Sequence, residues 1–447
     1  MRNQGPWALG SRPQAGLQRG SRMSSPAGEI SYRFRSYRPG KTLAPVTIVT
    51  PQDDASQLHA GGFVHTFFDV CPFSPSQRFL AVTRIPYGDR VPVLGDLADV
   101  CVIDLERETL RRVYTTAAWE LQLGANVQWG RTDRFLYSND IIDGQGAGVR
   151  IDLDSGETRA LAGPLYHIDS AETNIIGFPL DLLNATQRGY GIPEPPDVER
   201  RPLTCASDVE GLWRTMLEPN EKTLLVSIGD IVRATHDVIP EHTITYLFHS
   251  KYNRDGSRIM QVVRSIDQRH PRRKFGRMLV TFRADGSAIT CAIAEDFWGG
   301  GGNHPNWHPD GAHLVMNLKP DGQMTRFCQF LHDGADFKVL SERHAGGGHP
   351  SLNGEATFLL TDAYRGEARA LPGFETWPSD EVPIRLLDLR SDEEAHVCTI
   401  NTLGVSGRFR LDPHPAWSRD SSMICFNGAP EGARAVLIAD LRSCTRG

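Results

Sequence analysis

The strongest constraint on the fold is a repeated unit built around a lead residue and an apolar or aromatic residue three positions later. Four copies begin with histidine, at His249, His304, His349 and His414, as in HPNWHPDGAHLVMNL and HPAWSRDSSMICFNG. Three weaker copies begin at Val70, Asn126 and Leu165. The seven anchor residues are Phe73, Trp129, Ile168, Tyr252, Trp307, Leu352 and Trp417. A unit that recurs along the chain in this way indicates a repeat architecture.

The residues around each anchor follow one succession of strand patterns. A polar turn comes first, then an apolar strand such as HLVMNL, then a second strand such as VPIRLLDLRS, and in six copies a shorter third strand. These segments alternate or run continuously in apolar residues and are bounded by Gly, Asp, Asn and Pro. Short strands in such units, with almost no helical periodicity, predict an all-β fold, a seven-bladed β-propeller.

The two ends of the repeat array predict how the ring closes. The seventh copy stops near Leu441 without an outer strand, and residues 41–50, KTLAPVTIVT, form an apolar strand outside any copy. Pairing this N-terminal strand with the last blade would remove an exposed sheet edge. We therefore expect one propeller domain over residues 29–447, preceded by a disordered basic arm over residues 1–28.

Composition excludes several classes of protein. A formal charge of −6 over 447 residues favours neither a nucleic-acid partner nor a membrane surface. No apolar run is long enough to span a bilayer. The eight cysteines are scattered without close pairs, which favours buried reduced thiols over a disulfide framework. The N-terminus lacks the apolar segment of a secretory signal, so we expect a cytoplasmic protein.

The repeat predicts where the four lead histidines lie. Equivalent positions of different blades converge on the central channel, so histidines distant in sequence become neighbours there. Neutral imidazoles from several blades suit a divalent ion of the manganese, iron or zinc type. The metal ligands predicted on this basis are His249, His304, His349 and His414. The alternative is that each ring only bonds the backbone of a nearby turn.

The long insertions are expected on the same face of the ring as those histidines. They fall between second and third strands, at 86–99, 182–207, 265–276 and 364–380. Their Arg, Tyr, Asp and Trp residues suit a polar ligand, and functional residues concentrate in loops on rigid scaffolds. The third insertion contains the basic run RHPRRK, which fits either an acidic ligand or a solvated loop.

Two stretches, HPNWHPDGAHLVMNL and DPHPAWSRDSSMICFNG, resemble the oligogalacturonate lyases. Those are propeller enzymes that split oligouronides by β-elimination around a manganese ion held by histidines. The resemblance covers most of residues 41–441, and its metal site falls on His304 and His414, with His249 beside them. It departs from the family at Asp412, where a histidine is expected, and at Phe409, near the position of a glutamine. Zinc or calcium therefore remain alternatives to manganese, and ulvan-type propeller lyases remain alternative relatives.

The resemblance implies a metal-dependent lyase whose partner is an oligosaccharide that carries uronate. Such chemistry needs a group that removes the proton beside the carboxylate, and the candidates are His65, Arg188, Tyr190 and Arg214. In the related lyases an arginine is the proposed base, and Arg214 lies in the comparable blade region; the alternative is that Arg214 is a plain strand residue. A non-catalytic propeller that binds a carbohydrate or a protein partner is the alternative, since a fold does not fix a function. A hydrolase or an epimerase at the same site is a third. The sequence leaves the sugar, the linkage and the oligomeric state open.

Overall fold

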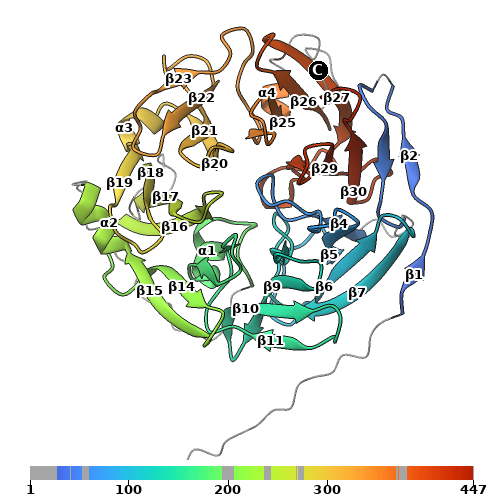
Figure 1. Ribbon diagram of the computed structural model, residues 1–447, viewed down its shortest axis with the longest axis horizontal. Helices are drawn as coiled ribbons and strands as arrows, with labels where there is room; N and C mark the ends of the chain where they lie inside the picture. The colour runs from blue at the N-terminus through green and yellow to red at the C-terminus, as the bar shows by residue number, and fades with distance from the viewer. Residues whose placement is uncertain are drawn as a thin grey trace, which may run out of the picture.

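The computed structural model describes residues 28–40, 42–52, 60–193, 206–235, 243–267, 269, 276–368, 371 and 380–445. The predicted basic arm falls on residues 1–28, of which all but Gly28 lie outside the described residues. The described residues form seven sheets that stand around one central axis (Figure 1), which confirms the seven-bladed β-propeller.

The first four blades follow the repeats in chain order, with the innermost strand first. Blade 1 contains β4 (Ala60–Val64), β5 (Phe79–Tyr87), β6 (Ala98–Asp104) and β7 (Thr109–Thr116). Blade 2 contains β8 (Gln128–Trp129), β9 (Phe135–Ile142), β10 (Gln145–Asp152) and β11 (Thr158–Ala160). Blade 3 contains β12 (His167–Ile168), β13 (Asn174–Gly177), β14 (Gly211–Met216) and β15 (Glu221–Ser227). Blade 4 contains β16 (Thr243–Tyr252), β17 (Arg258–Asp267), β18 (Gly276–Arg283) and β19 (Thr290–Ile293).

Blades 5 and 6 repeat this order, and blade 7 departs from it. Blade 5 contains β20 (Gly302–Trp307), β21 (His313–Leu318), β22 (Arg326–Leu331) and β23 (Lys338–Val339). Blade 6 contains β24 (Ser351–Leu352), β25 (Phe358–Thr361), β26 (Glu381–Asp388) and β27 (Glu393–Asn401). Blade 7 takes β28 (Ala416–Trp417), β29 (Met423–Gly428) and β30 (Ala435–Asp440) from the C-terminal end.

The ring closes through N-terminal strands, as the sequence predicts. Strand β3 (Val46–Ile48) pairs antiparallel with β30, and β2 (Arg35–Tyr37) pairs with β3 at the outer edge of blade 7. Strand β1 (Ile30–Ser31) pairs with β7 on blade 1 instead. The N-terminal segment therefore crosses the seam between the first and last blades, where it runs along the outer rim in Figure 1.

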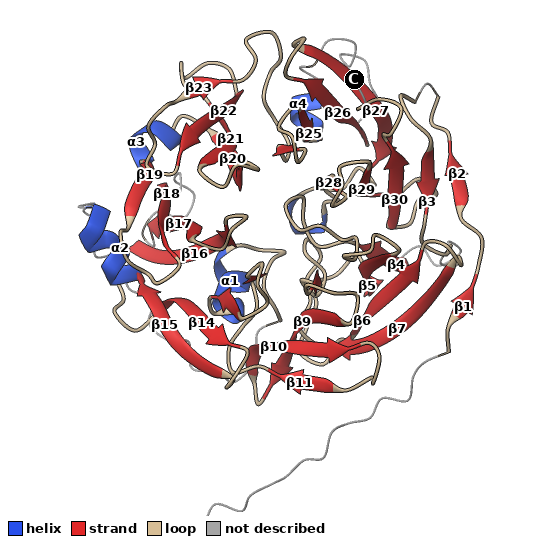
Figure 2. Cartoon of the chain, in the orientation of Figure 1, coloured by secondary structure: helices blue, strands red, loops and turns tan. Residues whose placement is uncertain are grey.

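Helices are few and lie in connections between strands. They are α1 (Leu180–Thr186), α2 (Ile228–Thr235), α3 (Glu295–Trp298), α4 (Arg365–Ala368) and one 3-10 turn, η1 (Gly407–Phe409). In Figure 2, α2 and α3 lie at the outer rim, whereas α1 lies nearer the axis. Among the described residues no helix is long and apolar enough to cross a membrane.

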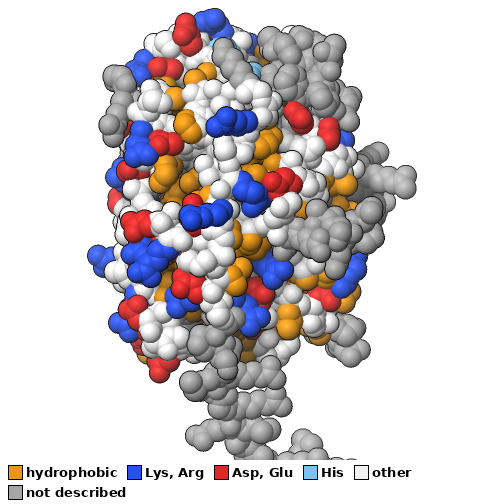
Figure 3. Space-filling model, turned by 90° about the vertical axis from the view of Figure 1, so that its right-hand side faces the viewer, with side chains coloured by type: hydrophobic (Ala, Val, Ile, Leu, Met, Phe, Trp, Pro, Cys, Tyr) orange, Lys and Arg blue, Asp and Glu red, His pale blue; other side chains and the backbone are white. Residues whose placement is uncertain are grey.

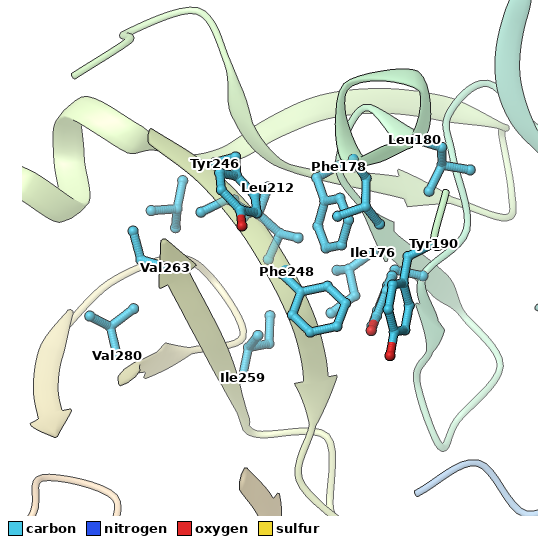
Figure 4. Packing of buried hydrophobic residues seen from close by; sticks show 14 of the residues in the cluster. Ile176, Phe178, Leu180, Tyr190, Leu212, Tyr246, Phe248, Ile259, Val263 and Val280 are labelled. Carbon is cyan, nitrogen blue, oxygen red and sulfur yellow. The ribbon is translucent and has the colours of Figure 1, made fainter. Parts of the chain in front are cut away.

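The hydrophobic core is divided among the junctions between blades. Seven separate clusters of buried apolar residues occur, one for each pair of neighbouring blades. Figure 4 shows the junction of blades 3 and 4, where Phe178 and Leu212 face Tyr246 and Phe248. Because each sheet buries both faces against its neighbours, the blade strands read as nearly continuous apolar runs.

The three tryptophan anchors fix the height of their own inner strands relative to the preceding blade. The indole N–H of Trp307 donates to the carbonyl of Lys251 on blade 4 at 3.0 Å. Trp417 donates to Ser351 on blade 6 at 3.3 Å, and Trp129 donates to Pro72 on blade 1 at 2.8 Å. Since each lead residue lies three positions before its anchor, these bonds bring the lead residues of successive blades to one level of the channel.

Candidate metal centre and its surroundings

The lead residue of the repeat has a left-handed backbone conformation in four blades. Asn126, His249, His304 and His414 have positive φ angles of 54°, 63°, 62° and 48°. Strand pairing slips beside two of them, between Phe248 and Ser250 and between Asn303 and Asn306. Bulges of this kind change the direction of a side chain, and left-handed backbone is costly for most non-glycine residues. The same unfavourable conformation in four blades is therefore a common device that turns the lead side chain toward the channel.

Three buried side chains lie close enough to hold one metal ion. The ligand atoms of His349, Asp412 and His414 all lie within 4.8 Å of one another, and the Nε2 of His414 is 3.8 Å from an Asp412 oxygen. The rings of His349 and His414 are perpendicular, with centroids 4.4 Å apart. Blade 6 supplies the first ligand and the lead-in to blade 7 supplies the other two.

Hydrogen bonds orient His349 and leave His414 without a partner. The Nδ1 of His349 donates to both oxygens of the buried Asp362, at 2.9 and 3.0 Å, which leaves Nε2 as the atom with a lone pair. Both ring nitrogens of His414 are buried and have no hydrogen-bond partner among the described residues. A buried polar atom without a partner is costly, so an unmet ring beside two other ligand atoms fits a bound cation.

The surroundings of the two histidine ligands favour a neutral ring at His414 and a protonated ring at His349. Burial and the neighbouring His349 lower the pKa of His414 well below its ordinary value. Burial disfavours the charged form of His349 as well, but Asp362 outweighs it, and the pKa of His349 is raised. A metal ion would replace the proton on His349, because only the neutral ring offers a lone pair.

A chain of contacts extends from Asp412 to Tyr190. The Nε of Arg410 donates to Asp412 at 2.6 Å, and its Nη2 donates to the hydroxyl of Tyr190 at 2.9 Å. Burial raises the pKa of Tyr190, and the positive charge of Arg410 opposes that rise. The structure therefore places Tyr190, one of the predicted proton-transfer residues, beside the candidate metal centre.

The segment that carries Asp412 is held from two sides. The side chain of Gln122 donates to the carbonyls of Arg408 and Arg410 at 3.1 and 2.8 Å. The buried Arg434 donates to the carbonyl of Phe409 at 2.8 Å. Phe409, which stands near the position of a glutamine in the lyases, thus contributes a carbonyl to this support.

His304 lies beside the three ligands and already has two partners. Its ring centroid is 4.1 Å from that of His349. Its Nδ1 donates to the carbonyl of Gly348 at 2.7 Å, and its Nε2 accepts from the hydroxyl of Tyr364 at 3.2 Å. The same hydroxyl is 3.5 Å from the Nε2 of His349. Tyr364 therefore joins two of the four predicted ligands.

His249, the remaining predicted ligand, belongs to a second cluster. Its Nε2 donates to Asp69 at 2.7 Å, and the ammonium of Lys251 lies 3.2 Å from the same carboxylate oxygen. Burial opposes the ionisation of Asp69, but Lys251 and His249 outweigh it and hold the pKa of Asp69 below its ordinary value. Lys251 follows His249 toward the turn between β16 and β17, whereas Asp412 precedes His414. The charged partners of the two lead histidines therefore come from opposite sides of the lead position in sequence.

An aromatic pair from blade 1 occupies the channel between the two clusters. The ring centroid of Phe67 lies 4.7 Å from His414 and 5.6 Å from His249. Phe68 lies 5.4 Å from His349 and 5.8 Å from His304. Both rings are buried and come from the segment after β4. They separate the metal-ligand cluster from Asp69 with apolar surface.

The other predicted proton-transfer residues occupy different places. His65 is fully buried near His414, and burial lowers the pKa of His65 to about 4. Arg188 is exposed. Arg214 lies on β14 and donates to the carbonyl of Ala284 at 3.5 Å, in the turn after β18. The structure does not bring Arg188 or Arg214 into the histidine cluster.

A different arginine reaches the site from blade 4. Arg264 donates to Gln187 at 2.7 Å and to Asn303, the neighbour of His304, at 3.3 Å. Its positive charge acts on both His304 and Tyr190. Arg264 could not be singled out from the sequence, because it lies inside a strand pattern. Asp362 and Tyr364, in contrast, open the long insertion of blade 6 and could have been singled out as polar residues on the histidine face.

The outer flank of the ring differs from this interior. In Figure 3, Lys and Arg side chains alternate with Asp and Glu across the face in view, with small apolar areas between them. The described part of this face carries no continuous field of one sign.

Solved structures with this fold include two oligogalacturonate lyases. Oligogalacturonate lyase in complex with manganese is 17% identical, with a TM-score of 0.63, and the alignment covers 92% of this chain and 97% of that one. Oligogalacturonate lyase from Vibrio parahaemolyticus is 15% identical, with a TM-score of 0.62, over 93% and 98% of the two chains. The chain has the fold of these lyases. No protein-family profile matches the sequence, and no curated protein matches it.

Proposed function

We propose that this protein is a metal-dependent lyase that cleaves an oligosaccharide containing uronic acid by β-elimination. The observation that carries the proposal is the buried set of His349, Asp412 and His414, whose ligand atoms face one another within 4.8 Å. The shared fold with two oligogalacturonate lyases, one of them solved with manganese, supports the substrate class and the metal.

The three ligands suit manganese or a similar divalent ion. Two imidazole nitrogens and one carboxylate oxygen form a mixed donor set that manganese, iron and zinc accept. Asp362 fixes the tautomer of His349, as carboxylates commonly do for metal-bound histidine. Arg410 holds Asp412 in place and partly balances its charge. When bound, the ion would supply positive charge that acidifies the proton beside the uronate carboxylate.

Elimination also requires a group that accepts that proton. In β-elimination the carbon bearing the carboxylate loses its proton, a double bond forms to the next carbon, and the glycosidic oxygen on that carbon leaves. Of the four residues predicted for this role, Tyr190 has its reacting atom two hydrogen bonds from Asp412, through Arg410. We assign Tyr190 to proton transfer; burial raises the pKa of its hydroxyl, and Arg410 opposes that rise.

Oligogalacturonate and manganese test the proposal directly. Metal-loaded protein should convert oligogalacturonate to products whose new double bond, conjugated with the carboxylate, absorbs in the ultraviolet. Tyr190→Phe should lower kcat by roughly 100-fold or more, because proton transfer by a placed side chain contributes that much, while manganese still binds. A wild-type protein that binds neither manganese nor uronide would disprove the proposal.

A non-catalytic propeller that binds a carbohydrate remains the competing function. It predicts that manganese does not change the affinity for uronide and that no unsaturated product appears with manganese bound. The unmet nitrogens of His414 favour the metal-dependent function, because a site for sugar alone leaves them unexplained.

A further inference from the structure

Two arginines face each other on blade 4, and neither forms an ion pair with a carboxylate in the described part of the chain. Arg264 on β17 and Arg277 on β18 are direct cross-strand partners. Like charges in this position destabilise a sheet. Among the described residues no carboxylate lies within ion-pair distance of either guanidinium, and the Nε of each is buried without a hydrogen-bond partner. The connecting segment 268–275 contains no acidic residue.

Neutral groups hold the pair at the edge of the candidate site. Arg264 donates to Gln187 and Asn303, and Arg277 donates to the carbonyl of Gly302 at 3.0 Å. Gln187 lies three residues before Tyr190, and Asn303 adjoins His304. Arg264 also lies over the ring of Phe248, and Arg277 lies beside Trp298. The two side chains are thus positioned by amides, carbonyls and rings, none of which supplies a negative charge.

The other end of the same strand pair has a second pair of facing arginines, and there one of them is exposed to solvent. Arg258 and Arg283 are also cross-strand partners on β17 and β18, but Arg283 is exposed to solvent. Burial and the charge of Arg283 lower the pKa of Arg258, and Asp333 only partly opposes that shift. The exposure of Arg283 to solvent thus relieves the repulsion at that end. At the end near the histidines, Arg277 is half-buried, and burial together with Arg264 lowers its pKa, while the more weakly acting Tyr246 and Glu295 oppose that shift.

We propose that Arg264 and Arg277 form a subsite for a second carboxylate of the substrate, on the uronate next to the one held at the metal centre. Guanidinium groups bind carboxylates in paired hydrogen bonds, so one anion would satisfy the buried Nε atoms and remove the repulsion. This inference rests on the proposed function for its substrate class. It predicts selectivity for chains with consecutive uronates over chains in which the neighbouring sugar is neutral.

Calorimetric titration of chelator-treated protein tests the subsite apart from the metal. Wild-type protein should bind trigalacturonate more tightly than it binds galacturonate. Arg277→Met should weaken trigalacturonate binding by roughly 10- to 100-fold, the loss expected for hydrogen bonds to a charged group. Arg277→Lys should fall between, because it keeps the charge and loses the fork. Arg283→Met, the matched control at the other end of the strand pair, should bind as the wild type does.

A second probe avoids dependence on the fold of the variant. The methyl ester of trigalacturonate has no carboxylate charge, so wild-type protein should bind it as weakly as Arg277→Met binds the acid. Equal affinity of wild type and Arg277→Met for trigalacturonate would overturn the subsite, as would a wild-type protein that does not bind trigalacturonate. If wild type binds trigalacturonate but neither holds manganese nor cleaves the chain, the lyase function fails and the subsite stands.

Discussion

Two buried clusters of imidazole and carboxylate lie along the same channel, and they differ in whether their atoms already have partners. In the cluster of Asp69, His249 and Lys251, each charged group meets another at 2.7 to 3.2 Å. In the cluster of His349, Asp412 and His414, a ring with two unmet nitrogens faces a carboxylate and a second ring. A histidine at the lead position therefore has no fixed role. Its role depends on which charged and polar side chains lie beside it.

The largest effect expected from this comparison is on stability, at Asp69. Asp69→Ala should lower the free energy of unfolding by about 3–5 kcal/mol, because it leaves a buried ammonium and an imidazole without their carboxylate. Chemical denaturation measures the change. Manganese affinity should stay near the wild-type value, and a large loss of manganese binding would show that the two clusters are not separate.

The reverse pattern is expected at His414. His414→Ala should weaken manganese binding by roughly 100-fold or more, since it removes a ligand and not an orienting group. The free energy of unfolding without metal should change less than in Asp69→Ala, because the ring has no hydrogen bond to lose. Calorimetry with manganese measures the affinity, and His313→Ala, at the start of β21, is the control. Unchanged affinity in His414→Ala would remove the metal centre.

A third buried carboxyl lies between these extremes and gives a pH dependence. Glu120 is fully buried, its nearest cation is Arg408 at 3.7 Å, and burial raises the pKa of Glu120 from 4.5 to about 7. Because the unfolded chain releases this proton at lower pH than the folded chain, the contribution of Glu120 to stability falls as pH rises from about 4.5 to 7. The free energy of unfolding of Glu120→Gln, measured relative to wild type, should therefore be roughly 2 kcal/mol higher at pH 8 than at pH 5. Denaturation at the two pH values measures the gain, and an equal difference at both would contradict it.

The smallest effect tests the orientation of a ligand. Asp362→Asn should weaken manganese binding by roughly tenfold or more, because the amide no longer favours one tautomer of His349. The same substitution should lower the pKa of His349, which Asp362 holds up against burial. Titration of the imidazole by NMR in metal-free protein measures that shift. Manganese affinity equal to wild type would mean that Asp362 acts only in folding.

The fold could be predicted from the sequence because each blade corresponds to one copy of the repeat. The seven anchors, the order of strands within each blade and closure through residues 41–50 all follow from local patterns, and the structure confirms them. The tryptophan bonds between blades explain why one register of lead residues meets in the channel.

The partners of the histidines could not be predicted, because they come from outside the register. Asp69 follows Phe67 and Phe68, and none of these three residues belongs to a position of the repeat. The sequence also leaves unstated which direction Arg214 and Arg264 face on their strands. Polar partners in a channel depend on strand twist and loop path across several blades, and neither is a local property of the chain.

The strand exchange at the seam has a consequence for how the chain is made. The partner of β3 is β30, so residues that leave the ribosome early must wait for nearly the last ones before they can pair. During synthesis the first blade would present an open side to the cell, and blade 7 would be the last to form. If translation is slow or ends early near the C-terminus, the whole ring should then fail to close, and the loss should not be limited to one blade.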